Sequence, residues 1–254
     1  MNAEAWNMVI VVCMALAGTA AALLLRRRRP HGLDFLQRNL LATNISYFAT
    51  LYTFFLSFAV ITLWNNYTQA TEDLAHEAYV ATTLARTSRL LPDAGPFQEA
   101  MAGYLESVVQ EEWPAMSQGE RSPTTRARYE SVWRSWENLK PRNMEQTAYH
   151  VRMLEDLEQL SHMRHARLES IQGSLLWPFW VLIHLGFAFT VVALFYTELG
   201  HGLADTWYMG MMLLMVIVII WLIRELDTPF TGVLHLNADR FLEAAERVRE
   251  LMGH

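Results

Sequence analysis

Apolar residues are concentrated in four long segments of the chain, and the residues between them are mostly polar. The segments cover residues 8–25, 40–64, 175–196 and 207–223, and they are 18, 25, 22 and 17 residues long. His184 is the only Asp, Glu, Lys, Arg or His in any of them. A helix that crosses the hydrocarbon core of a bilayer needs about 17–25 such residues. The pattern therefore predicts four transmembrane helices.

The region between the second and third apolar segments is hydrophilic and has a helical pattern throughout. Residues 65–174 contain 16 acidic and 11 basic residues. Apolar positions recur there every three or four residues, as on one face of a helix. The first of four predicted helices continues the second span without a break, and the fourth runs into the third span. Ser122 and Asn143 have the sequence context of helix N-caps.

The last part of the chain contains one more amphipathic segment. Residues 238–252 place Phe241, Ala245, Val248 and Met252 on one face, which predicts a helix that packs on the extramembrane part of the protein. No segment has the alternating pattern of a strand. We therefore expect an all-α integral membrane protein with an extramembrane helical bundle between spans two and three. The predicted divisions are 1–64 (spans one and two), 65–174 (the bundle), 175–223 (spans three and four) and 224–254 (a turn and the last helix).

Composition and charge narrow the class of protein. Only 18% of the residues are charged, and the net charge is −6, so the chain lacks the basic surface that nucleic-acid binding requires. Cys13 is the only cysteine, which excludes an intrachain disulfide. No nucleophile elbow, phosphate loop or zinc-protease motif occurs. We expect no enzymatic activity and no cofactor.

The arginines around the first span predict the orientation in the membrane. Glu4 precedes this span and Arg26–Arg29 follow it, whereas residues 65–80 contain no Lys or Arg. Basic loops remain in the cytoplasm. The pattern favours a multi-pass protein whose N-terminus and 65–174 region are outside and whose 26–39 loop is cytoplasmic.

Small hydroxyl side chains form a stripe along the second span. Their spacing of three and four residues places them on one helical face. Such a stripe either lines a water-filled path or allows helices to pack closely through hydrogen bonds. Phenylalanines on the same helix could form a hydrophobic gate. The candidate pore-lining residues are Thr43, Ser46, Thr50, Thr53, Ser57, Phe48, Phe54, Phe55 and Phe58.

Histidines are the remaining candidates for chemistry. His184 is an ionisable residue inside a span, where a neutral ring that hydrogen-bonds to a neighbouring helix is the simpler interpretation. His76, His162 and His165 lie near carboxylates on two helices of the predicted bundle, where metal sites can form. Solvated helix faces explain them better, so we expect no metal site.

Several short motifs together resemble the bestrophin-like membrane domain family of bacteria, a domain of unknown function. They include a Tyr…Glu-Trp-Pro-x-Met motif and a closing Leu-Asp-x-Pro-Phe-x-Gly motif. The positions that match are Trp64, Tyr67, Ala70, Glu77, Ala78, Tyr104, Glu112, Trp113, Pro114, Met116, Arg164, Arg167, Leu168, Leu226, Asp227, Pro229, Phe230 and Gly232.

The resemblance implies a function. Bestrophins are oligomeric ion channels whose second span lines the pore. It therefore implies a homo-oligomer in the bacterial inner membrane that passes inorganic ions through the lipid bilayer. Bestrophins keep the region between spans two and three in the cytoplasm, which is opposite to the orientation that Arg26–Arg29 favour. The alternative function is a non-conducting sensor or scaffold whose bundle binds a ligand or a protein partner.

Overall fold

The computed structural model describes residues 35–171, 173–196 and 203–253. The predicted first span, Cys13 and Arg26–Arg29 lie outside these residues. Within the described ranges every regular element is helical and none is a strand. Three of the described helices are long and apolar enough to cross a membrane. They contain the predicted second, third and fourth spans.

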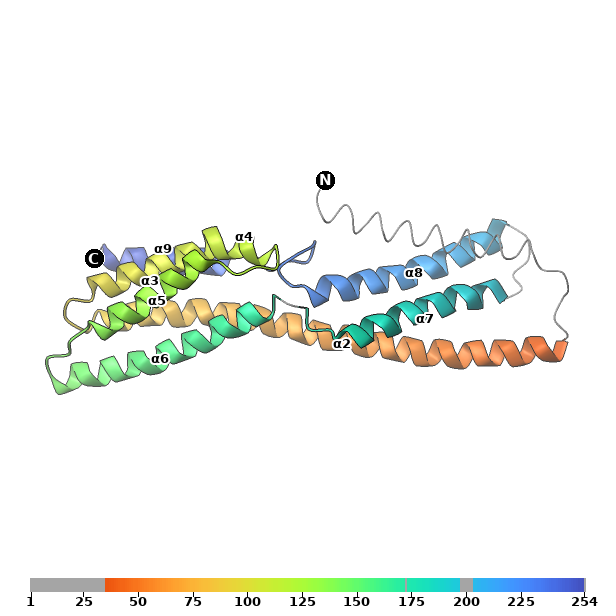
Figure 1. The fold of residues 1–254 in the computed structure, drawn as a ribbon, viewed down its shortest axis with the longest axis horizontal. Helices are drawn as coiled ribbons and strands as arrows, with labels where there is room; N and C mark the ends of the chain where they lie inside the picture. The colour runs from red at the N-terminus through yellow and green to blue at the C-terminus, as the bar shows by residue number, and fades with distance from the viewer. Residues whose placement is uncertain (1–34, 172, 197–202, 254) are drawn as a thin grey trace. The chain divides into compact units, whose positions relative to one another are not determined.

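The chain divides into two compact units (Figure 1). Met1–Asn65 and Ser174–Asp227 form the first, which we call the membrane unit. Its described helices are the first part of α2 (Phe35–Ser88), α7 (Trp177–Tyr196) and α8 (Leu203–Asp227).

The second unit, which we call the bundle, consists of Asn66–Gly173 and Thr228–His254. It contains the second part of α2 and five further α-helices. These are α3 (Gly95–Ser107), α4 (Trp113–Met116), α5 (Pro123–Glu137), α6 (Met144–Glu169) and α9 (Asp239–Met252). A π-helical turn, η1 (Val108–Glu112), joins α3 to α4.

Local signals in the sequence define the ends of the bundle helices. The side chain of Ser122 accepts a hydrogen bond from the Thr125 amide at 3.2 Å, and that of Asn143 accepts one from the Gln146 amide at 2.8 Å. Both predicted N-caps are therefore confirmed. The predicted continuous passage from α2's span into the bundle is also confirmed, since α2 is one helix of 54 residues.

The predicted continuity between the fourth bundle helix and the third span is wrong. α6 ends at Glu169 and α7 begins at Trp177, and the described residues between them are not helical. Gly173 weakens a helix at this point, and Pro178 is tolerated only in a helix's first turn because it has no amide hydrogen. The Leu175 amide instead donates to Oδ1 of Asp227 at 2.8 Å.

The core of the bundle forms around α3, which packs on both α5 and α9 (Figure 1). Phe97, Met101 and Leu105 of α3 are completely buried, as is Phe241 of α9. The predicted apolar face of α9 is thus turned into the bundle, except for Met252, which is 36% exposed. The last helix therefore packs on other helices of the bundle.

Candidate functional site: the α2 hydroxyl face and the buried motif cluster

One face of α2 in the membrane unit packs against α7. The Tyr52 hydroxyl donates a hydrogen bond to the Ile183 carbonyl oxygen at 2.8 Å. Phe48 contacts Phe189 with their ring centroids 3.7 Å apart. This packing face also carries the buried side chains of Leu56, Ala59 and Leu63.

The hydroxyl stripe lies on a different face of the same helix. Thr43, Ser46, Thr50, Thr53 and Ser57 are all exposed in the described structure. At about 100° per residue, the stripe is roughly 140° around the helix from Tyr52. We call it the hydroxyl face. Neither α7 nor α8 buries it in the described structure.

The hydroxyl groups are partly satisfied by their own helix. Thr43, Thr50 and Ser57 donate to the carbonyl oxygens four residues earlier, at 2.9, 2.9 and 2.8 Å. Such a bond lowers the cost of placing a hydroxyl in an apolar environment. Each oxygen still has a lone pair that can face water, an ion or another helix.

The four candidate phenylalanines fall into two pairs, one that packs toward α7 and one that is exposed. Phe55 stacks with Phe179 of α7, with 5.9 Å between ring centroids, and Phe48 also packs toward α7. Phe54 and Phe58 are 74% and 57% exposed. Only Phe54 and Phe58 therefore remain available to contact anything outside the subunit's own described helices.

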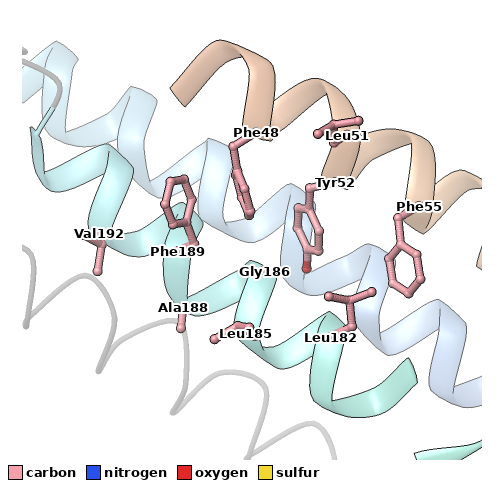
Figure 2. A pocket seen from close by; sticks show the side chains of 10 residues that line it. All are labelled: Phe48, Leu51, Tyr52, Phe55, Leu182, Leu185, Gly186, Ala188, Phe189 and Val192. Carbon is pink, nitrogen blue, oxygen red and sulfur yellow. The ribbon is translucent and has the colours of Figure 1, made fainter. Parts of the chain in front are cut away.

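A cavity of about 540 Å³ lies between α2 and α7 in the membrane unit (Figure 2). Its walls are aromatic and aliphatic, and Tyr52 supplies the only polar side-chain atom. Gly186 allows α7 to approach α2 closely, since a Cβ atom there would lie 2.1 Å from the Tyr52 ring. The cavity offers no group for catalysis or metal binding.

His184 forms its hydrogen bond within α7. Its Nδ1 lies 2.7 Å from the carbonyl oxygen of Trp180, and the ring is exposed. The expected hydrogen bond to a neighbouring helix is therefore wrong, because this partner lies one turn earlier on the same helix.

Four of the motif residues meet in the interior of the bundle. Glu77 comes from α2, Tyr104 from α3, Glu112 from η1 and Arg167 from α6, and none is more than 2% exposed. Arg167 donates from Nε to Glu77 Oε2 at 2.8 Å and from Nη2 to Glu112 Oε2 at 2.8 Å. The Tyr104 hydroxyl donates to Glu77 Oε1 at 2.7 Å. We call these residues, with Arg164, the motif cluster.

Arg164 completes the charge balance of the motif cluster. It donates from Nη2 to Glu112 Oε1 at 2.9 Å, and its guanidinium lies over the Tyr129 ring at 5.0 Å. Two carboxylates thus face two guanidinium groups. Removing one partner from such a buried arrangement leaves an unpaired charge in a low-dielectric interior.

The protonation of the motif cluster follows from its burial and its charges. Burial raises the pKa of the Tyr104 hydroxyl well above its usual range, and the nearby Glu77 carboxylate adds to this. Burial alone would lower the pKa of Arg167, but Glu77 and Glu112 outweigh it and raise the pKa above its ordinary value. Tyr104 therefore keeps its proton and Arg167 its charge. Such groups suit a structural role better than proton transfer.

Trp113, next to the motif cluster, fastens the closing motif to the bundle. Its indole Nε1 donates to the Leu236 carbonyl oxygen at 3.1 Å. Its ring contacts Phe230 and Phe241, with centroids 5.6 and 5.7 Å apart. Gly232 has a φ of 82°, in the left-handed region that favours glycine. The sequence did not explain why Phe230 belongs to this turn, and the contact with Trp113 does.

The histidines proposed as weak metal candidates do not gather. His76 Nε2 lies 3.1 Å from Gln159 Nε2, and His165 Nε2 lies 3.1 Å from Glu169 Oε1 on its own helix. Nowhere in the described ranges do three His, Cys, Asp or Glu side chains come together as a metal site would require.

Comparison with known proteins gives one family and one fold. The model of the bestrophin-like domain matches residues 12–241. A mutant of a bacterial bestrophin homologue from Klebsiella pneumoniae is similar over 100% of both chains, with a TM-score of 0.68 and 12% identity. A second mutant of that homologue has a TM-score of 0.64 and 13% identity, again over 100% of both chains. A structure described as a membrane protein has a TM-score of 0.69 and 12% identity over 98% of both chains. No curated protein matches.

Proposed function

The chain belongs to the bestrophin-like family, and we propose that it is a homo-oligomeric ion channel of the bacterial inner membrane whose pore is lined by α2. The solved structures with this fold are of bacterial bestrophin homologues. At 12–13% identity they support the fold, so the argument for the pore depends on the residues of this chain.

The exposed hydroxyl face of α2 is the observation that carries the proposal. Five hydroxyl side chains follow one face of a helix that is otherwise suited to lipid, and the subunit's α7 and α8 leave them uncovered. Lipid offers these oxygens no partner, whereas water or a hydrated ion does. A subunit with so few spans encloses no conduit. Several copies, with their hydroxyl faces around a common axis, would form one.

Phe54 and Phe58 supply a gate in this arrangement. Both side chains are more than half exposed in the described structure. A ring of phenylalanines, one from each subunit, excludes water from a narrow pore and so blocks ions without a plug. Phe48 and Phe55 do not take part, because they pack against α7.

The motif cluster supports the pore from outside the membrane. It ties α2 to α3, η1 and α6 through charged hydrogen bonds among Glu77, Glu112 and Arg167. Since α2 is one continuous helix, a fixed outer half limits how far its inner half can rotate or slide. We assign the family-motif residues this positioning role.

We also propose that the bundle lies outside the cell and that the 26–39 loop is cytoplasmic. The arginine-rich loop supports this orientation through the positive-inside rule. A cysteine at Gly95, in a protein whose Cys13 is replaced, should react with an impermeant thiol reagent in intact cells. Labelling only after permeabilisation would reverse the orientation.

Ion flux in proteoliposomes tests the proposed channel. Thr50→Val and Thr53→Val should lower the flux per assembled oligomer, because the path loses groups that solvate ions. Phe54→Ala or Phe58→Ala should raise it. Phe55→Ala is the matched control and should not raise it, since Phe55 packs on Phe179. If the wild type and all variants are silent to cations and anions while the oligomer is intact, the sensor or scaffold function replaces the channel.

A further inference from the structure

A groove between α2 and α9, on the surface of the bundle, has a chemistry that the channel function does not use. It has a volume of about 250 Å³. Arg86 from α2 and Arg240 and Arg247 from α9 line it, together with the hydroxyl side chains of Tyr79, Thr82 and Thr83. Its other lining residues are three alanines, Ala75, Ala78 and Ala244, and the single carboxylate Glu243.

The arginines of this groove lack the close carboxylate partners that several other arginines of the bundle have. Arg164, Arg167 and Arg249 each pair closely with a carboxylate. Within the described ranges, Arg86 and Arg240 form no ion pair, and Arg247 reaches only Glu243, at 3.8 Å between two well-exposed side chains. Three guanidinium groups thus surround the groove with one weakly engaged carboxylate.

The groove carries positive charge although the bundle as a whole is negatively charged. The residues assigned to this unit include 20 Asp and Glu but only 14 Lys and Arg. Like charges that gather on an acidic surface without partners repel each other. They are stabilised when an anion binds between them.

The shape of the donors and the size of the groove indicate the class of anion. We propose that this groove binds a small oxyanion, namely phosphate or the phosphate group of a monoester. Guanidinium groups present planar pairs of N–H donors that match two oxygens of phosphate. A spherical chloride ion cannot use this match. A groove of about 250 Å³ is smaller than the usual range for drug-sized ligands, so it suits the phosphate group rather than a whole nucleotide.

The hydroxyl groups add directional donors to the groove. Thr82 already donates to the Ala78 carbonyl oxygen at 2.9 Å, which leaves Tyr79 and Thr83 to donate to the anion. A bound oxyanion would bridge Arg86 of α2 to Arg240 of α9. It would therefore hold the last helix against the helix that we assign to the pore, but its binding does not depend on conduction.

Calorimetric titration of the full chain in nanodiscs of neutral lipid, with inorganic phosphate at constant ionic strength, tests the proposal. We expect saturable binding that Arg86→Gln and Arg240→Gln each weaken at least tenfold. Arg240→Lys, which keeps the charge and loses the planar donor pair, should weaken it less than Arg240→Gln does. Arg89→Gln is the matched control, because it removes the same charge beyond the groove and should leave the affinity unchanged.

A second arm separates a soluble phosphate from a lipid headgroup. If the ligand in the membrane is a headgroup, nanodiscs that contain phosphatidic acid should abolish the phosphate titration. If it is soluble, the titration should persist. Either result supports the oxyanion site. The proposal would be overturned if the wild type did not bind phosphate. It would also be overturned if chloride displaced phosphate as effectively as phosphate itself does, or if both glutamine variants kept the wild-type affinity. Circular dichroism of each variant separates lost binding from lost folding.

Discussion

The two parts of α2 differ in which of their side chains are buried. In the membrane unit, Leu51, Phe54 and Ile61 are more than half exposed, and the five hydroxyl side chains are exposed as well. In the bundle, Leu74, Ala81 and other apolar residues of the same helix are turned into the core and completely or almost completely buried. A helix in lipid can leave large apolar side chains unburied, whereas a helix in water gains stability by covering them.

The contrast extends to the polar groups. The bundle buries charge only where charge meets charge, as Arg167 does between Glu77 and Glu112. The described part of α2 contains no charged side chain between residues 40 and 64, and its polar side chains are hydroxyls apart from Asn44 and the indole of Trp64. Buried ion pairs therefore hold the helices of the bundle together. The exposed hydroxyls of the membrane unit can instead face water, an ion or another helix.

The largest effect should come from breaking the charge balance of the bundle. Arg167→Met leaves Glu77 and Glu112 buried without their shared partner, which should destabilise the protein by about 3–5 kcal/mol. The melting temperature of the detergent-purified protein measures it. Arg126→Met is the control, because Arg126 forms an exposed pair with Glu130 and should melt close to the wild type. Equal melting of the two variants would show that the buried network does not stabilise the bundle.

Trp113 tests how the closing motif is held. Trp113→Ala removes the contacts with Phe230 and Phe241 as well as the hydrogen bond to Leu236, and should cost about 3 kcal/mol. Trp113→Phe keeps an aromatic ring and loses the hydrogen bond, for about 1 kcal/mol. Thermal unfolding should rank the wild type first, Trp113→Phe second and Trp113→Ala last. A loss of flux without any loss of stability would argue against this structural role.

Two glycine positions in the membrane unit test how closely α2 packs on α7. Gly186→Ala would drive a methyl group into the Tyr52 ring, so we expect about 1–3 kcal/mol of destabilisation. At Gly210 of α8 nothing lies within 4 Å of a new Cβ. Gly210→Ala should be neutral or slightly stabilising, because alanine favours the helix. If both variants melt alike, the close contact between α2 and α7 does not limit packing.

The smallest effect should come from a pair on the bundle surface. The hydrogen bond from Arg249 lowers the pKa of Glu106, and partial burial of Glu106 opposes this. Because the folded-state pKa is the lower one, the pair's contribution is present above the ordinary pKa of glutamate and is lost as the pH falls through the folded-state value. Glu106→Gln should thus melt slightly below the wild type at neutral pH. The difference should disappear in acid, and a difference that persists there would rule out this pair as its cause.

Local patterns in the sequence predicted much of the fold. The apolar runs predicted the spans of α2, α7 and α8, and the polar residues Ser122 and Asn143 predicted where two bundle helices begin. Helix caps and hydrophobic periodicity act within a few residues, which is why they can be read from one sequence. The break between α6 and α7 was missed, because the residue that receives the freed Leu175 amide, Asp227, is 52 positions away.

The sites were harder to predict for the same reason. The resemblance to the family named Glu77, Glu112 and Arg167, but their spacings of 35 and 55 residues say nothing about contact. A buried glutamate on an apolar helix face is the one local signal, since it requires a partner of opposite charge elsewhere. The hydroxyl stripe was visible as a pattern. Which phenylalanines of α2 stay exposed was not, because that depends on where α7 packs.

Blocking of ion flux through a single cysteine on the hydroxyl face tests the central claim most directly. In a protein whose Cys13 is replaced by serine, Thr53→Cys is compared with Leu185→Cys, since Leu185 is exposed on α7. An impermeant, charged thiol reagent is added to proteoliposomes during the flux measurement. A pore lined by α2 predicts that the reagent blocks flux through the Thr53→Cys protein and leaves the Leu185→Cys protein unaffected. Unblocked flux through Thr53→Cys after its modification is confirmed by mass spectrometry would contradict the account.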